Sequence, residues 1–253
     1  MNHLLSKIGS YPFEKLNLLH KDIKPSKEVI NLSIGEPKLN ADSKVLDILN
    51  KETHSFSNYP PMNAVPELSE AYRQYLESHF GIKNVAEDEV CLVAGTREGT
   101  FSIIQALFNK ENVKEKPYVV MPNPFYQIYG GATTLAGGEA KFLDCPEEDN
   151  FQPSLDSLKS EDWQKCQILV LCSPNNPTGS VLPPSKLKDI LNLADKYDFY
   201  VVSDECYVDL YTSEKSCPSI LQASSDRSDR LVALDRKSTR LNSSHRCISY
   251  AVF

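Results

Sequence analysis

Two apolar runs that each end abruptly in polar residues constrain the fold of this chain more than any other feature. Residues 200–203 read Tyr-Val-Val-Ser and are followed by Asp204, while the run at 167–172 is followed by Ser-Pro-Asn-Asn-Pro-Thr-Gly at 173–179. Short apolar runs bounded by polar or turn residues are typical of buried parallel strands. Ligands of open α/β sheets bind at the carboxyl ends of such strands. The pattern therefore predicts that both polar clusters contribute to one site.

Extended and helical patterns alternate along the rest of the chain. Apolar runs typical of strands occur at 89–94, 118–121 and 231–235, and the apolar spacing of helices occurs at 67–79 and 186–197. This alternation predicts an α/β fold.

The composition argues against several classes of protein. The net charge of −7 argues against a general binder of nucleic acid or anionic membranes. No stretch approaches the apolar length of a membrane span, and the first residues are too few and too polar for a signal peptide, so we expect a cytoplasmic protein. The seven cysteines form no C-x-x-C pair and have no histidine spacing suited to zinc, so we expect reduced core thiols and no metal site. Cys206 could be a reactive thiol, but a small packing residue is the favoured interpretation.

Asn-Pro-Thr-Gly at 176–179, followed by Asp204-x-x-Tyr207, resembles the pyridoxal-phosphate-dependent aminotransferases of class I and II, which have fold type I. The resemblance implies that Asp204 faces the pyridine nitrogen of the cofactor, and that Asn176 and Tyr207 donate hydrogen bonds to its phenolic oxygen. An anion opposite the ring nitrogen keeps it protonated, which makes the ring a better electron sink. The alternative is that Asp204 is a helix cap or loop acid and that Asn-Pro-Thr-Gly is only a turn.

The residues Gly95, Thr96 and Arg97 separate a predicted strand from a predicted helix. Such a turn directs free backbone N–H groups and the positive end of the helix dipole at a phosphate. In the family this turn binds the cofactor phosphate, and the resemblance assigns that role to these three residues. It also assigns to Tyr126, within Pro-Asn-Pro-Phe-Tyr-Gln-Ile-Tyr at 122–129, the aromatic ring that stacks on the pyridine. The alternative is that these aromatic residues belong to a core helix.

Two further roles rest on short segments near the N-terminus. Gly35, in Ser-Ile-Gly-Glu-Pro, matches the glycine that lies beside the substrate carboxylate in the family, although a plain turn glycine is an equal alternative. Tyr59 matches the tyrosine that reaches the cofactor phosphate of the neighbouring subunit, which implies a homodimer. Ala64 replaces the usual glycine in this segment, so the local backbone differs from the family pattern.

The resemblance covers about residues 10–235 and implies a three-layer sandwich with a mostly parallel central sheet. We expect residues 1–50 to form an N-terminal arm and part of a small domain, and 51–235 to form an incomplete cofactor-binding large domain. From Arg236 the composition turns basic and serine-rich, and the string Arg-Lys-Ser-Thr-Arg-Leu-Asn-Ser-Ser-His resembles a translated sequencing adapter. We therefore interpret 236–253 as a tail that is foreign to the family.

The family normally presents its catalytic lysine in a Ser-x-Ser-Lys stretch after the strand that corresponds to 231–235. This chain has Arg-Lys-Ser-Thr there, and Lys237 falls a residue or two early. Because a small error in position removes a catalytic group from its reacting atoms, we interpret Lys237 as an incidental lysine. We expect the chain to lack the catalytic lysine and the arginine that binds the substrate carboxylate.

The segments at 11–16, 33–37 and 122–129 look most like those of bacterial N-succinyldiaminopimelate aminotransferases. This resemblance implies transamination between glutamate and N-succinyl-2-amino-6-oxopimelate in the synthesis of diaminopimelate and lysine. Two alternatives stay open. One is an aminotransferase for aspartate or aromatic amino acids, and the other is an inactive fragment that at most binds pyridoxal 5'-phosphate.

Overall fold

A computed structural model of the chain describes residues 2–9, 11–30, 40, 42–57, 66–111, 117–210, 217–224, 229–236 and 249–252. The α-helices are α1 (Pro12–His20), α2 (Ser43–Lys51), α3 (Pro66–Phe80), α4 (Thr96–Leu107), α5 (Gln127–Ala136), α6 (Ser160–Trp163), α7 (Pro184–Tyr197) and α8 (Ile220–Ala223). The strands are β1 (Val90–Val93), β2 (Tyr118–Asn123), β3 (Glu139–Asp144), β4 (Cys166–Cys172), β5 (Tyr200–Asp204), β6 (Leu231–Arg236) and β7 (Ser249–Val252). Short 3-10 helices are η1 (His3–Lys7), η2 (Thr53–Ser57), η3 (Glu87–Glu89), η4 (Glu147–Asp149) and η5 (Leu155–Ser157).

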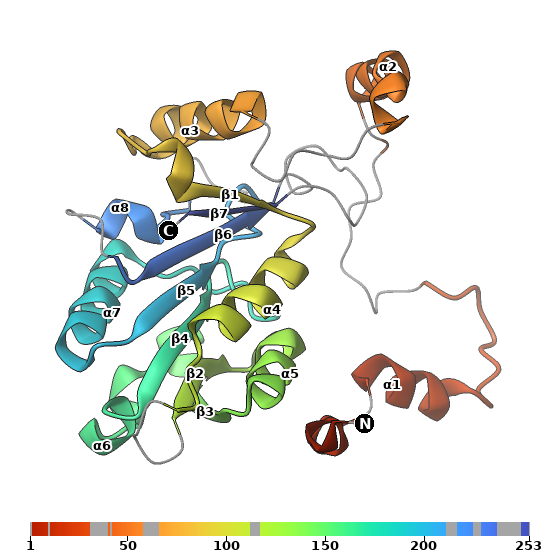
Figure 1. Cartoon of the computed structure of the whole chain (residues 1–253). Helices are drawn as coiled ribbons and strands as arrows, with labels where there is room; N and C mark the ends of the chain where they lie inside the picture. Colours follow the sequence, from red (N-terminus) through yellow and green to blue (C-terminus); the bar gives the residue numbers. More distant parts are fainter. Residues whose placement is uncertain are drawn as a thin grey trace.

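The strands form one sheet in the order β1-β7-β6-β5-β4-β2-β3 (Figure 1). The five strands from β3 to β6 are parallel, and β7 runs antiparallel to both of its neighbours, β6 and β1. The predicted α/β fold with a mostly parallel sheet is confirmed. In the register of the two central strands, Cys172 at the end of β4 lies beside Asp204 at the end of β5.

Helices cover both faces of the sheet and produce three layers (Figure 1). On β5, Val201 packs into the cluster that contains α7, whereas Val202 packs into the cluster that contains α4 and α5. Neighbours on β4 alternate in the same way, with Leu169 on the α7 side and Val170 on the other. Because both faces are buried, residues at every position of these strands can be apolar, which explains the continuous apolar runs in the sequence.

The N-terminal elements η1, α1, α2 and η2 bury none of their residues. Their large apolar side chains include Leu18 and Leu19, which are 70% and 75% exposed. Helices of nine residues are marginal in water without tertiary packing. The assignment of residues 1–50 to an N-terminal arm and part of a small domain stays a prediction.

Across the described ranges, the structure contains no helix that is both long and apolar enough to cross a membrane. The same part of the chain contains no group of three or more His, Cys, Asp or Glu side chains arranged to hold a metal ion.

Candidate active site

The carboxyl end of β5 carries a buried acid whose partners are neutral. Asp204 is 5% exposed. Its Oδ2 accepts a hydrogen bond of 2.7 Å from the hydroxyl of Tyr129, and its Oδ1 accepts one of 3.2 Å from the backbone N–H of Cys206. A buried carboxylate needs such donors, because leaving it without them costs several kcal/mol. A carboxylate offers about four acceptor positions, so it can accept from a ligand as well as from these two donors.

Tyr129 is the functional candidate that the sequence did not reveal. It lies on α5, three residues after Tyr126, and is fully buried. Burial, followed by the charge of Asp204, holds the pKa of its phenol well above the usual value, so the hydroxyl remains a donor at neutral pH. The sequence alone does not distinguish Tyr129 from the other aromatic residues near α5, because its partner Asp204 lies 75 positions later in the chain.

The second part of the site is the N-terminus of α4. Gly95 precedes this helix with φ +106°, a conformation that glycine adopts readily. The first N–H groups of an α-helix have no acceptors within the helix, and the helix dipole adds partial positive charge there. The turn that was predicted to bind phosphate therefore offers the donors that a phosphate requires.

A contact between Cys206 and Thr96 joins these two parts. The thiol of Cys206, two residues after Asp204, donates to the hydroxyl oxygen of Thr96 at 2.9 Å. Burial and the charge of Asp204 raise the pKa of this thiol well above its usual value. A thiol held protonated in this way is a poor nucleophile, which favours the packing role over the reactive one.

The side chain of Arg97 meets the ring that was predicted to stack on the cofactor. Its Nε donates to the hydroxyl of Tyr126 at 2.7 Å, and its guanidinium lies 5.8 Å from the centre of that ring. Tyr126 in turn meets Tyr129 edge to face, with 5.8 Å between ring centres. The ring of Tyr126 is therefore fixed from two sides. We call Thr96, Tyr126, Tyr129, Asp204 and Cys206 the strand-end cluster.

The two predicted donors to the phenolic oxygen follow β4 and β5. Tyr207 is half-buried, and the guanidinium of Arg236 lies 4.9 Å from the centre of its ring. Burial raises the pKa of Tyr207 and Arg236 opposes this effect, while the charges of Cys206 and Asp204 contribute further increases. Tyr207 is therefore electrostatically coupled to the strand-end cluster.

Asn175 stabilises the loop that carries Asn176. The side-chain amide of Asn175 donates to Thr178 at 2.9 Å, and its backbone carbonyl accepts from the N–H of Gly179 at 2.8 Å. Asn176 itself is half-buried. Asn175 therefore stabilises the turn, and the neighbouring Asn176 is the candidate for ligand binding.

Three predicted site residues, Gly35, Tyr59 and Lys237, lie outside the described residues. A cavity of about 630 Å³ is lined by residues 148–150, 152–156, Lys186, Asp189 and Leu193, none of which belongs to the strand-end cluster. This cavity does not suit a phosphate ester, since its lining has four acidic residues and one lysine.

The Tyr129→Phe variant is expected to lower the free energy of unfolding by about 2 kcal/mol, because a buried carboxylate loses its closest donor while the packing volume is kept. Urea unfolding measures this change. Tyr11→Phe, at an exposed tyrosine of the N-terminal arm, is the matched control and is expected to unfold like the wild type. Equal stability of the two variants would contradict a stabilising role of the Tyr129 hydroxyl.

Residues 27–235 match the family model described as aminotransferase class I and II. The chain is 28% identical over 222 residues to the LL-diaminopimelate aminotransferase of Maridesulfovibrio salexigens, covering 86% of this chain and 56% of the relative. It is 28% identical to the aspartate aminotransferase of Pyrococcus horikoshii, covering 81% of this chain and 52% of the relative. A solved aminotransferase from Neisseria meningitidis superposes with a TM-score of 0.92 at 37% identity, covering 100% of this chain and 65% of that chain. The chain thus spans about half the length of the curated relatives it matches.

Proposed function

Since this chain belongs to the class I and II aminotransferases, a family that depends on pyridoxal 5'-phosphate, we propose that the strand-end cluster holds that cofactor. The observation that carries the proposal is the contact between Cys206 and Thr96, which keeps a buried acid and a helix N-terminus in one place. This cofactor requires a carboxylate that accepts from its protonated ring nitrogen and N–H groups that donate to its phosphate.

In the proposed arrangement each residue has a defined task. Asp204 holds the proton of the ring nitrogen, and the hydroxyl of Tyr129 fixes the orientation of Asp204. The backbone of Gly95 and Thr96 and the side chain of Arg97 hold the phosphate.

The remaining contacts orient the ring. Tyr126 covers one of its faces, and Asn176 and Tyr207 donate to its phenolic oxygen. When bound, pyridoxal 5'-phosphate supplies the electron sink that makes a Cα proton of the substrate removable. Tyr59 of a second copy and Gly35 complete the site in the proposal, which therefore includes a homodimer of the whole protein.

For the whole protein we propose transamination between glutamate and a keto acid that carries a second carboxylate, with N-succinyl-2-amino-6-oxopimelate as the specific candidate. The two curated relatives are named for diaminopimelate and aspartate, and both of these amino acids have a distal carboxylate. The N-succinyl substrate is supported by the sequence resemblance at 11–16, 33–37 and 122–129 alone. An aminotransferase for aspartate is the second candidate, favoured by the relative from Pyrococcus horikoshii.

We keep the proposal that residues 236–253 are foreign to the family. The family match ends at Asp235, although residues 249–252 of this tail form β7, which pairs with β6 and β1. A chain without the family's lysine can bind the cofactor but cannot hold it covalently. The 253-residue chain is therefore expected to bind pyridoxal 5'-phosphate reversibly and to show no turnover.

This proposal is tested by adding pyridoxal 5'-phosphate, reducing with borohydride and mapping any labelled peptide. We expect saturable binding by absorbance and no label. A label on Lys237 together with turnover would refute the assignment of Lys237 as incidental, and absence of saturable binding would refute the cofactor site. A screen of amino donors and keto acids with a protein that continues into Ser-x-Ser-Lys then distinguishes the diaminopimelate, aspartate and aromatic substrates.

A further inference from the structure

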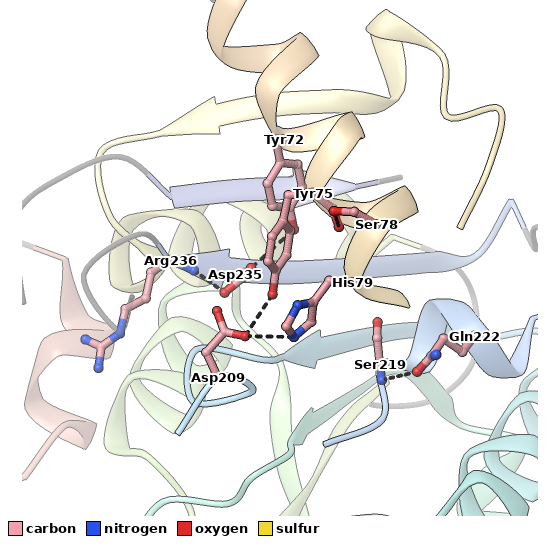
Figure 2. A network of polar contacts seen from close by, with 9 residues as sticks. All are labelled: Tyr72, Tyr75, Ser78, His79, Asp209, Ser219, Gln222, Asp235 and Arg236. Carbon is pink, nitrogen blue, oxygen red and sulfur yellow. Dashed lines mark hydrogen bonds and ion pairs between the residues drawn. The ribbon is translucent and has the colours of Figure 1, made fainter. Parts of the chain in front are cut away.

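A row of rings on α3 faces the segment that follows β5 (Figure 2). The rings of Tyr72 and Tyr75 stack with 5.9 Å between centres and 20° between planes. Tyr75 and His79 stack with 4.9 Å between centres, again at 20°. The three residues recur at intervals of three and four, so they form one stripe along the helix.

Two members of this stripe, Tyr75 and His79, contact the carboxylate of Asp209 in the segment that follows β5, while Tyr72 meets a second carboxylate, that of Asp235, at 3.5 Å. The hydroxyl of Tyr75 donates to Oδ1 of Asp209 at 2.9 Å, and Nε2 of His79 lies 3.2 Å from the same oxygen (Figure 2). The side chain of Asp209 is only 13% exposed. Two groups that meet one partly buried oxygen fix its position more narrowly than a single surface contact does.

Between Asp204 and Asp209 the chain is held by short-range bonds and by packing. The N–H of Val208 bonds to the carbonyl of Glu205 at 3.0 Å, and the N–H of Leu210 bonds to the carbonyl of Tyr207 at 2.9 Å. Val208 is 1% exposed and packs in the apolar cluster that contains α3. Tyr207 therefore sits in a turn whose first end is anchored by β5 and whose second end is anchored by α3.

We propose that Asp209, held by Tyr75 and His79, is a positioning residue that fixes the direction of the Tyr207 hydroxyl. The inference rests on the proposed function, in which this hydroxyl donates to the phenolic oxygen of the cofactor. Asp209 acts through the backbone of the turn, because two residues separate it from Tyr207 and its own oxygen is directed toward α3. Its loss removes the polar anchor of the second end of the turn, while the packing of Val208, β5 and the strand-end cluster remain in place.

The test compares two substitutions at one position. Asp209→Ala removes the acceptor, and we expect the dissociation constant for pyridoxal 5'-phosphate to rise about tenfold. The absorbance maximum of the bound cofactor is expected to shift, because its phenolic oxygen loses a fixed donor. Asp209→Asn keeps the Oδ1 acceptor, so it is expected to stay within about threefold of the wild type. Amide hydrogen exchange across 205–210 is expected to speed up in the alanine variant alone.

Controls separate this inference from the proposed function. Glu77→Gln alters an exposed carboxylate on the same helix and is expected to match the wild type. If Asp209→Ala unfolds the chain, Tyr75→Phe removes only one hydroxyl, and we expect about a threefold loss of affinity. Equal affinity, spectrum and exchange in Asp209→Ala, Tyr75→Phe and wild type would overturn the positioning role. If the wild type binds no cofactor, the proposed function fails. Faster amide hydrogen exchange across 205–210 in Asp209→Ala would then still support the anchoring of the turn by α3.

Discussion

The Asp204→Asn variant is expected to bind pyridoxal 5'-phosphate about 10- to 100-fold more weakly than the wild-type chain. Asparagine keeps the size of the side chain and an oxygen that can accept from Tyr129, but it carries no negative charge to meet a protonated pyridine nitrogen. The expected loss corresponds to about 1.4 to 2.7 kcal/mol, the range of a charge-assisted hydrogen bond. Titration of the cofactor followed by absorbance measures it.

The matched control is Asp156→Asn, which changes an acid in η5 outside the strand-end cluster. This variant is expected to bind the cofactor like the wild type. Circular dichroism verifies that both variants are folded, so that a loss of affinity reports on the site. Equal affinities of Asp204→Asn and the wild type would contradict the placement of the pyridine nitrogen at Asp204.

The Glu205→Gln variant is expected to be more stable than the wild type at pH 8 by about 3 kcal/mol. Glu205 is 4% exposed, and burial raises its pKa from 4.5 to about 7. Between these two values the folded chain keeps a proton that the unfolded chain has released. The stability of the wild type therefore falls as the pH rises from about 4.5 to about 7, and glutamine removes this decrease.

Glutamine can also keep the two bonds that Oε1 of Glu205 accepts, from the hydroxyl of Ser203 at 3.0 Å and from the N–H of Ile220 at 2.8 Å. Urea unfolding at pH 4.5 and pH 8 measures the difference, which is expected to be near zero at the lower pH. Glu77→Gln, at an exposed acid, is expected to follow the wild type at both values. An advantage of Glu205→Gln that is the same at both pH values would argue against a raised pKa.

The parts of the fold that follow from local pattern were predictable. Residues 166–172 and 200–204 are strands because their apolar runs are buried on both faces, and α3 and α7 follow the helical spacing of their apolar residues. The apolar residues at 29–34 also predict a strand, but this segment falls largely outside the described residues, and residues 29 and 30 are not in a strand.

The side-chain partners at the site were less predictable, because they depend on contacts between distant positions. A carboxylate at the end of a buried strand needs a cation or a hydrogen-bond donor, and for Asp204 the donor is a tyrosine 75 positions earlier. The link between Cys206 and Thr96 spans 110 positions, and the one between Tyr75 and Asp209 spans 134. Neither contact leaves a periodic or compositional signal in the sequence, so only the folded topology reveals it.

The edge strand β1 is joined to the rest of the sheet by its antiparallel pairing with β7. Val90 at one edge pairs with Val252, so β1 is hydrogen-bonded to a segment about 160 positions later, within the tail that we propose to be foreign to the family. Closing so long a loop is slow, because its entropy must be overcome before the pairing contributes any stability. Until then β1 has no hydrogen-bonded neighbour among the described strands, and its unpaired backbone groups form an open sheet edge.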